Sequence, residues 1–392
     1  MGGSHSHDDD PDWSLPPALR KYVLWIVVPL VVATLAGMVL LWPKGETPSL
    51  GTVEYASGRV TQIKDCTPQQ PDCQVVVVEV VDGPGVGEVT ELNLQSGEGA
   101  PLVEVGSEVW LTASDFEGAA SYAFADIKRD QPLLLLVLMF AAAVVLLSRW
   151  KGVAALAGLA VSMLLLAFFL LPALVQGGPP VAIAAVGASA IAMATMGLAH
   201  GFTMRTGVAL IGTIIALLLT AFLGAVFTTA ARFTGVGGED AFYLQNSPVA
   251  LSIDLRGLFL AGLVIGALGV LDDVTVTQAA AVWEVRRARP SSSLRDLFAA
   301  GMRVGRDHVA ATVNTLVLAY IGASLPLFLI LVMSDTPLSK TLTSEFIAQE
   351  IVRSMVGSLG LIAAVPITTF AAAWILTRPQ SAPAPAPADA PA

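Results

Sequence analysis

Charged side chains are scarce in this sequence. Asp, Glu, Lys and Arg make up only 13% of its 392 residues, whereas hydrophobic residues make up 55% and the mean hydropathy is +0.71. A typical soluble domain carries about 25% charged residues, so this composition excludes a soluble globular protein of the usual kind. The long stretches without charge predict an integral membrane protein whose main partner is the lipid bilayer.

Basic stretches and enzyme motifs are also missing. The net charge is −10, and no run of Lys and Arg is interleaved with aromatic residues, which argues against nucleic acid as a partner. The sequence contains no GxSxG, no HExxH, no Walker lysine motif and no GxGxxG after a strand-like segment. We therefore expect no enzymatic activity, and the sequence identifies neither a cofactor nor a metal.

Long apolar runs contain most of the hydrophobic residues. A helix needs about 20 apolar residues to cross about 30 Å of hydrocarbon, because each residue adds about 1.5 Å. Eight runs have about this length, at 22–42, 132–148, 152–173, 181–199, 207–231, 257–280, 309–333 and 351–377. The sequence thus predicts an α-helical polytopic membrane protein with about eight spans, the first at 22–42 and the others in a seven-helix membrane domain at 132–377.

The first run could instead be a cleaved signal peptide, because Arg20 and Lys21 precede it. Its length of about 20 residues exceeds the usual apolar region of a signal peptide, about 7–15 residues. We therefore interpret it as a retained signal anchor, with cleavage as the alternative.

Lysine and arginine in short loops predict the orientation, because the cytoplasmic side of a membrane protein retains positive charge. With the N-terminus inside, the inner side receives Arg20, Lys21, Arg149, Lys151, Arg205, Arg286, Arg287, Arg289 and Arg295. A smaller set lies outside, namely Lys128, Arg129, Arg232, Arg256 and Lys340. We predict that both termini are cytoplasmic, with disordered tails at 1–21 and, rich in Ala and Pro, at 378–392.

Residues 50–129 differ in character from the apolar runs. Strand-like segments rich in β-branched residues alternate with Gly, Pro, Asp and Ser, at 51–63, 74–81, 88–94, 107–113 and 120–127. Five short strands in about 80 residues are typical of a small β-barrel of the OB type, with a sandwich as the alternative. The predicted orientation makes this domain extracytoplasmic. Because the domain is not basic, an OB-like fold would not imply oligonucleotide binding.

Cys66 and Cys73 are the only two cysteines, and they bracket the segment TPQQPD between the first two predicted strands. On the oxidising side of the membrane such a pair is expected to form a disulfide. The alternatives are two free thiols or a metal site, and the latter is disfavoured because no His or third Cys lies nearby.

The sixth run carries ionisable residues, which are costly inside a bilayer and therefore point to a site. It reads GLFLAGLVIGALGVLDDVTVTQAAAVWEV, with two adjacent aspartates. At 100° per residue, a face about 80° wide holds Gly266, Gly269, Asp273, Thr277 and Glu284. These glycines, with Gly262, would let a neighbouring helix approach while Asp273 points into the contact. Asp272, about 100° away, is expected to face another helix or another wall of the same cleft.

The seventh run carries a second polar face. In GMRVGRDHVAATVNTLVLAYIGASLP, about 40° of the helix surface holds Arg303, Asp307 and Asn314. Because the sixth and seventh helices run in opposite directions, Asp273 and Asn314 are expected at similar depth, about 10 Å inside the inner boundary, where they could touch. Arg303 and Asp307 lie near the inner interface, where charged side chains also reach water without a special role.

Three long segments carry a resemblance to a known family. They are IGALGVLDDVTVTQAAAVWEV, GMRVGRDHVAATVNTLVLAYIGASLPL and EIVRSMVGSLGLIAAVP. Together with AHGFTMRTG and the domain after the first run, they make residues 20–377 resemble the YibE/F-like family of multi-spanning bacterial membrane proteins. The resemblance implies a place in the bacterial inner membrane, and the aspartate of a GALGxxxD pattern matches Asp273. The family's biochemical function is not known, and it is often regarded as a permease.

Three classes of function remain open. The first is a secondary transporter or permease with an intramembrane carboxylate site for a cation or proton, with Asp273 as its main group. Its further candidate residues are Asn314, Asp272, Thr277, Glu284, Arg303 and Asp307. The second is a non-transporting scaffold whose domain at 50–129 binds an envelope protein. The third is an intramembrane enzyme, which would need a second catalytic group beside Asp273. The sequence favours the permease.

Overall fold

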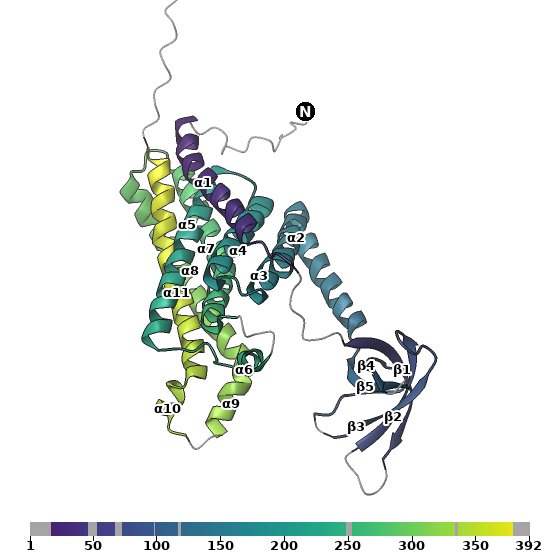
Figure 1. Ribbon diagram of the computed structural model, residues 1–392. Coiled ribbons are helices and arrows are strands. Elements are labelled where there is room, and N and C mark those ends of the chain that lie inside the picture. Colours follow the sequence, from purple (N-terminus) through teal and green to yellow (C-terminus); the bar gives the residue numbers. More distant parts are fainter. Residues whose placement is uncertain are drawn as a thin grey trace, which may run out of the picture. The chain divides into compact units, whose positions relative to one another are not determined.

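The computed structural model describes residues 17–45, 53–66, 73–97, 99–116, 119–247, 253–333 and 336–378. The chain divides into a helical unit, residues 1–48 and 147–392, and a β unit, residues 49–146. Figure 1 shows the elements of both, and each unit is described here by itself. Most of the two predicted tails, 1–16 and 379–392, lies outside the described residues.

The helical unit consists of long apolar helices, as expected in lipid, where a helix satisfies its own backbone polar groups. The long helices are α1 (Pro17–Leu41), α2 (Asp130–Leu165, whose first part belongs to the β unit), α4 (Pro180–His200), α5 (Met204–Ala230), α7 (Leu255–Ala288), α8 (Leu294–Ala323) and α11 (Glu345–Leu376). The short ones are the π-helical turn η2 (Leu166–Leu170), α3 (Leu171–Val175), α6 (Glu239–Asn246), α9 (Leu325–Met333) and α10 (Leu338–Leu342).

Six helical stretches in the described chain are long and apolar enough to cross a membrane. The helices α8 and α9, bent by 64° at a short break, make a seventh if the pair is one span. The predicted runs at 181–199, 207–231, 257–280 and 351–377 correspond to α4, α5, α7 and α11. The chain is therefore a multi-pass membrane protein with most of its predicted spans in place.

Two predicted boundaries need correction. The helix α1 begins at Pro17, so the end of the predicted tail at 1–21 is helical, whereas its apolar span at Val23–Leu41 agrees with the predicted run at 22–42. Proline is favoured in the first turn of a helix, where its missing N–H costs nothing. The helix α8 begins at Leu294, well before the predicted residue 309, because Ser293 and Asp296 form a capping box that starts it.

One break interrupts the stretch that covers the predicted runs at 132–148 and 152–173. This stretch is helical over 46 residues from Asp130 to Val175, except at Arg149, where φ is 53° and ψ is −130°. A side chain at positive φ is strained, so the chain departs sharply from helical geometry at this residue. The boundary between the β unit and the helical unit, at Leu146 and Leu147, lies close to the same point.

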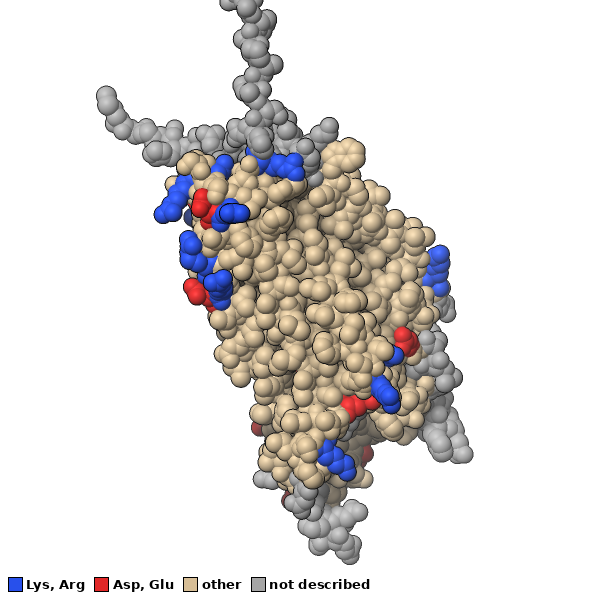
Figure 2. Space-filling view, turned by 90° about the vertical axis from the view of Figure 1, so that its left-hand side faces the viewer, with Lys and Arg blue, Asp and Glu red and all other residues tan. Residues whose placement is uncertain are grey.

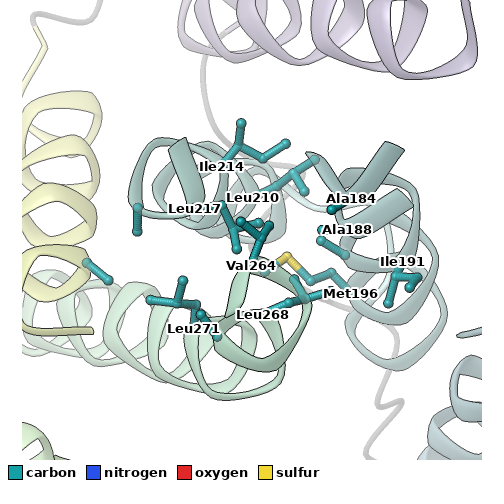
Figure 3. Packing of buried hydrophobic residues seen from close by; sticks show 14 of the residues in the cluster. Ala184, Ala188, Ile191, Met196, Leu210, Ile214, Leu217, Val264, Leu268 and Leu271 are labelled. Carbon is teal, nitrogen blue, oxygen red and sulfur yellow. The ribbon is translucent and has the colours of Figure 1, made fainter. Parts of the chain in front are cut away.

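The helices α4, α5 and α7 form the core of the helical unit. Figure 3 shows their apolar side chains interdigitating: Ala184, Ala188, Ile191 and Met196 from α4, Leu210, Ile214 and Leu217 from α5, and Val264, Leu268 and Leu271 from α7. The helix α11 packs against both α5 and α7. A Cβ added to Gly212 of α5 would overlap Thr368 of α11, and one added to Gly360 would overlap Thr220. Small residues therefore bring α5 and α11 into close contact.

A carboxylate joins the loop after α5 to the start of α11. Glu345 accepts hydrogen bonds from the backbone N–H groups of Thr234, at 2.7 Å, and Gly235, at 2.9 Å. It also accepts bonds of 2.9 Å from the Thr234 hydroxyl and from the side-chain amide of Gln349. Hydrogen bonds to an ionised acceptor are stronger than neutral ones, so this loop is held firmly to α11.

Most of the charge on the face drawn in Figure 2 lies away from its centre. Lys and Arg gather mainly at the upper end and along the upper left edge, a smaller mixed group of charges lies toward the lower end, and a basic residue lies on the right edge between them, while the broad central surface is uncharged. This distribution is typical of a protein whose middle band contacts lipid.

The β unit contains a curled antiparallel sheet of five strands, in agreement with the five predicted segments (Figure 1). They are β1 (Glu54–Asp65), β2 (Cys73–Asp82), β3 (Val89–Gln95), β4 (Glu108–Phe116) and β5 (Ala119–Ile127), in the order β3-β2-β1-β4-β5. Irregular pairing at Ser57 and Gly58, and again between Val60 and Gln62, bends the central strand β1. The bend produces a half-barrel around a small core that includes Val60, Val78, Val109 and Leu111.

A disulfide links Cys66, which follows β1, to Cys73, the first residue of β2. The two Cα atoms are 5.5 Å apart, within the range that a disulfide needs. This pairing confirms the prediction, although the segment between the two cysteines, 67–72, lies outside the described residues.

Candidate functional site

Asp272 lies at the centre of α7, where this helix packs against α4 and α5. Its carboxylate is directed toward α4, because the hydroxyl of Thr195 donates a hydrogen bond of 2.8 Å to Oδ2. The other oxygen, Oδ1, is buried and has no hydrogen-bond partner in the described part of the chain. No basic side chain among the described residues forms an ion pair with Asp272.

Buried threonines continue the polar contact from Asp272 to α5. The hydroxyl of Thr275 donates to the backbone carbonyl of Asp272 over 3.2 Å and lies 2.6 Å from the hydroxyl of Thr213. Because a hydroxyl has one proton, Thr213 donates to Thr275 when Thr275 donates to the carbonyl. Asp272 therefore lies on a line of polar groups that crosses α4, α7 and α5.

Thr195 can serve either protonation state of Asp272. Its single hydroxyl proton has three acceptors within reach, the Ile191 carbonyl at 2.9 Å, the Ala192 carbonyl at 3.2 Å and Asp272 Oδ2 at 2.8 Å. When the carboxylate is ionised, Thr195 donates to it. When the carboxyl group is neutral, its own O–H can donate to the Thr195 oxygen, which then donates to Ile191. The hydrogen bond between the two side chains persists in both states without movement of a helix.

The predicted small and acidic face of α7 is exposed. Asp273, Thr277 and Glu284 all lie on the surface of the helical unit, and Glu284 pairs with Arg287 at 2.9 Å. A Cβ added to Gly262 or Gly269 would meet nothing within 4 Å, whereas one added to Gly266 would lie 3.0 Å from the hydroxyl of Tyr320 on α8. Within the described chain, the close helix contact expected on this face is therefore formed at Gly266 and not at the other two glycines.

The helices α7 and α8 also contact each other on a face of α7 that the sequence interpretation did not select. Gln278 of α7 is buried, and its amide donates bonds to the Gly301 carbonyl, at 2.8 Å, and to the Thr369 hydroxyl, at 2.7 Å. A Cβ added to Gly301 would lie 2.8 Å from Val282 of α7, and one added to Gly305 would lie 2.9 Å from Gln278 of α7. The pair of small residues that joins these helices is thus on α8, where the sequence GMRVG has the spacing of such a contact.

The predicted residues of α8 are also exposed. Arg303, Asp307 and Asn314 form no hydrogen bond or ion pair with any residue that the structure describes. Asp273 and Asn314 are therefore not joined by a hydrogen bond here. Of the predicted site residues, the structure encloses Asp272 alone, and it adds Thr195, Thr213, Thr275 and Gln278, which the sequence interpretation did not select.

His200 is the last residue of α4 and is exposed. Arg205, Lys151 and Asp273 are the charged residues that act electrostatically on its imidazole. Asp273, which follows Asp272 in the sequence, is thus the acidic residue among them.

An ion pair lies toward the opposite end of the unit. Arg353 of α11 bonds Glu350 over 2.8 Å, and its guanidinium lies 5.4 Å from the ring centre of Phe259. Both partners are partly buried, and the Nε atom of Arg353 is buried without a hydrogen-bond partner in the described part of the chain.

Groups of three or more His, Cys, Asp or Glu that could hold a metal ion do not occur among the described residues. The arrangement around Asp272 can bind a proton or a single small cation, with hydroxyl and carbonyl oxygens completing the contacts.

A protein family matches most of the helical unit. Residues 136–378 match the family described as YibE/F-like protein. The matched segment is more than half of the chain. No curated protein and no solved structure matches the sequence.

Proposed function

The chain belongs to the YibE/F-like family, and we propose that it is a permease of the bacterial cytoplasmic membrane with Asp272 as its central binding group. In this proposal the Asp272 carboxylate takes up a proton or a small cation and releases it during transport of a solute. The observation that carries the proposal is the buried Oδ1 atom, which has no partner in the described chain.

The physical reason is the cost of an unpaired charge. An ionised carboxylate needs water, hydrogen bonds or a cation, and removing these inside a membrane costs several kcal/mol, on the order of 3 or more. Asp272 has one hydrogen bond to its carboxylate and no ion pair among the described residues. A bound proton or cation would remove the cost. The hydroxyl of Thr195, which suits both protonation states, supports reversible binding.

Asp273 takes a secondary role in this proposal. It is exposed and acts on His200, and it lies one residue from the binding carboxylate. We assign it to the entry route from the side of Arg205 and Lys151. The sequence had favoured Asp273 over Asp272, and the burial of the two side chains supports the reverse order.

The topology that we propose has eight spans with both termini in the cytoplasm. A continuous helix of the 46 residues from Asp130 to Val175 would be about 69 Å long, more than twice the hydrocarbon thickness. The break at Arg149 divides it into two spans, and α8 with α9 forms one bent span. The larger group of Lys and Arg in Figure 2 would face the cytoplasm.

For the β unit we propose an OB-type barrel on the extracytoplasmic side. Its strand order is that of an OB barrel opened between β3 and β5, and these two edge strands approach each other. Leu102 is 90% exposed and Val105 is 65% exposed on the same connection before β4. These apolar side chains favour a second function, in which the unit binds an envelope protein and the membrane helices serve as a scaffold.

Ligand-dependent stability of the purified full-length protein distinguishes the two functions. A ligand that binds only the folded state raises its stability, by about 2.7 kcal/mol at 100 times Kd. We expect the melting temperature in detergent to depend on pH or on Na⁺, K⁺ or Mg²⁺ for the wild type. Asp272→Asn should abolish this dependence, because the amide keeps the shape and removes the charge.

Two further variants complete the design. Asp273→Asn should keep the dependence, because this carboxylate is exposed, and Asp240→Asn on α6 controls for the loss of one negative charge. A wild type that no ion and no pH stabilises, with a strongly destabilised Asp272→Asn variant, would reject the permease and favour the scaffold.

A further inference from the structure

An apolar cavity of about 340 Å³ lies between α1, α4 and α5. Its walls include Val27 and Val31 of α1, Met193 and Met196 of α4, and Leu210 of α5. A cavity with such walls is unsuited to water or to an inorganic ion, because neither would find enough polar partners. It is suited to a hydrocarbon chain.

The helix α1 contacts α5 near its start and α4 near its end, and the cavity lies between these two contacts. A Cβ added to Gly207 of α5 would lie 2.7 Å from Val23, and one added to Gly37 of α1 would lie 2.7 Å from Val186 of α4. Between these contacts α1 does not fill the space with its own side chains. Most of its described side chains are exposed, so the helix is a thin outer wall of the cavity.

Positive charge lies where the cavity meets the start of α5. Phe202, Thr203, Met204 and Thr206 line this end, and Arg205 lies among them in the sequence. Arg205 is only partly exposed and forms no ion pair with a described residue.

The N-terminus of α5 adds to this positive field. Thr203 caps the helix, and its hydroxyl accepts a bond from the N–H of Thr206. The helix is 27 residues long, and the amide groups of its first turn carry partial positive charge.

We propose that this cavity binds one acyl chain of an anionic phospholipid, whose phosphate is held by Arg205 and by the amide groups of the first turn of α5. The apolar cavity matches the acyl chain of such a lipid, and the unpaired cation at its end matches the anionic headgroup. A zwitterionic lipid would match the cavity but not the cation. Basic residues between membrane helices on the cytoplasmic side are known to select anionic headgroups. A second copy of the chain does not fit, because its helix would be too wide for a cavity of this volume.

Native mass spectrometry of the full-length protein, reconstituted with equal amounts of phosphatidylglycerol and phosphatidylcholine of the same chain length, tests the proposal. We expect the wild type to retain phosphatidylglycerol in preference after delipidation. Arg205→Gln should lower this preference about fivefold, the equivalent of about 1 kcal/mol per basic residue at an anionic surface. Arg205→Lys should keep most of the preference.

Further variants separate the two parts of the site. Val31→Phe, which fills the cavity, should lower retention of both lipids. Arg295→Gln, at an exposed arginine of α8, should change neither. Equal retention of the two lipids by the wild type, or an Arg295→Gln variant that loses as much preference as Arg205→Gln, would overturn the site. Melting temperatures without added lipid show whether each variant is folded, and if Val31→Phe is not, the arginine variants decide alone.

Discussion

Asp272 and Asp273 are adjacent on α7, yet the carboxylate of Asp272 bonds Thr195 of α4 and that of Asp273 is exposed. Consecutive helical residues point about 100° apart, and here this rotation separates a packed interface from an open surface. The two aspartates are therefore chemically distinct groups. Substitutions at the two positions should have different effects, which makes the pair an internal control.

The hydrogen bond between Thr195 and Asp272 should stabilise the fold. Thr195→Val keeps the shape of the side chain and removes the donor, so it should lower the free energy of unfolding by about 1–3 kcal/mol. Asp272→Leu alone removes the other partner. If the bond stabilises the fold, the double variant should lose less free energy of unfolding than the two single variants lose together. The difference should be about 0.5 kcal/mol or more. Strictly additive melting data would show that the contact contributes nothing.

Glycines on α7 and α8 should respond in opposite ways to alanine. Gly305→Ala would place a Cβ against Val365 and should destabilise the protein by about 1–3 kcal/mol. Gly262→Ala meets open space and should be neutral or stabilising by up to about 1 kcal/mol, because alanine favours the helix. Thermal unfolding in detergent compares them. A larger loss at Gly262 would mean that an unseen helix covers this face.

Removing the disulfide should weaken the β unit. Cys66 and Cys73 lie seven positions apart in the sequence, and closing such a short loop stabilises a fold by about 2–3 kcal/mol in the chain-entropy estimate. Replacing both with serine should lower the unfolding temperature of the β unit in the full-length protein and leave the helical unit nearly unchanged. Alkylation of the wild type under non-reducing conditions should detect no thiol, and labelling of both cysteines would contradict the pairing.

Membrane-impermeant thiol labelling of intact cells should report the orientation. Ser96→Cys in the β unit should react, whereas Ser292→Cys between α7 and α8 should react only after the membrane is permeabilised. The native cysteines are joined in a disulfide and do not interfere. The opposite pattern would place the termini outside and reverse the proposed topology.

Much of the fold could be predicted from the sequence, because apolar length and β-branched alternation are local signals. The strands, the disulfide and most spans follow from such signals. The candidate site did not follow, because helical periodicity groups residues on a face without telling which face is covered. The face with Asp273 is uncovered, and the partners of Asp272 and Gln278 come from residues distant in the sequence, Thr195 and Thr369.

The bonds of Glu345 have a mechanical consequence. They fasten the loop after α5 to α11, and the contacts of Gly212 with Thr368 and of Gly360 with Thr220 interlock the same two helices further along. We expect α5 and α11 to move as one rigid body, with α7 fixed to α11 through Gln278. The helix α4 meets this body through apolar contacts, which can slide, and the bond of Thr195. A movement that exposes the Asp272 carboxylate to solvent would then be a displacement of α4 relative to the rigid body formed by α5, α7 and α11.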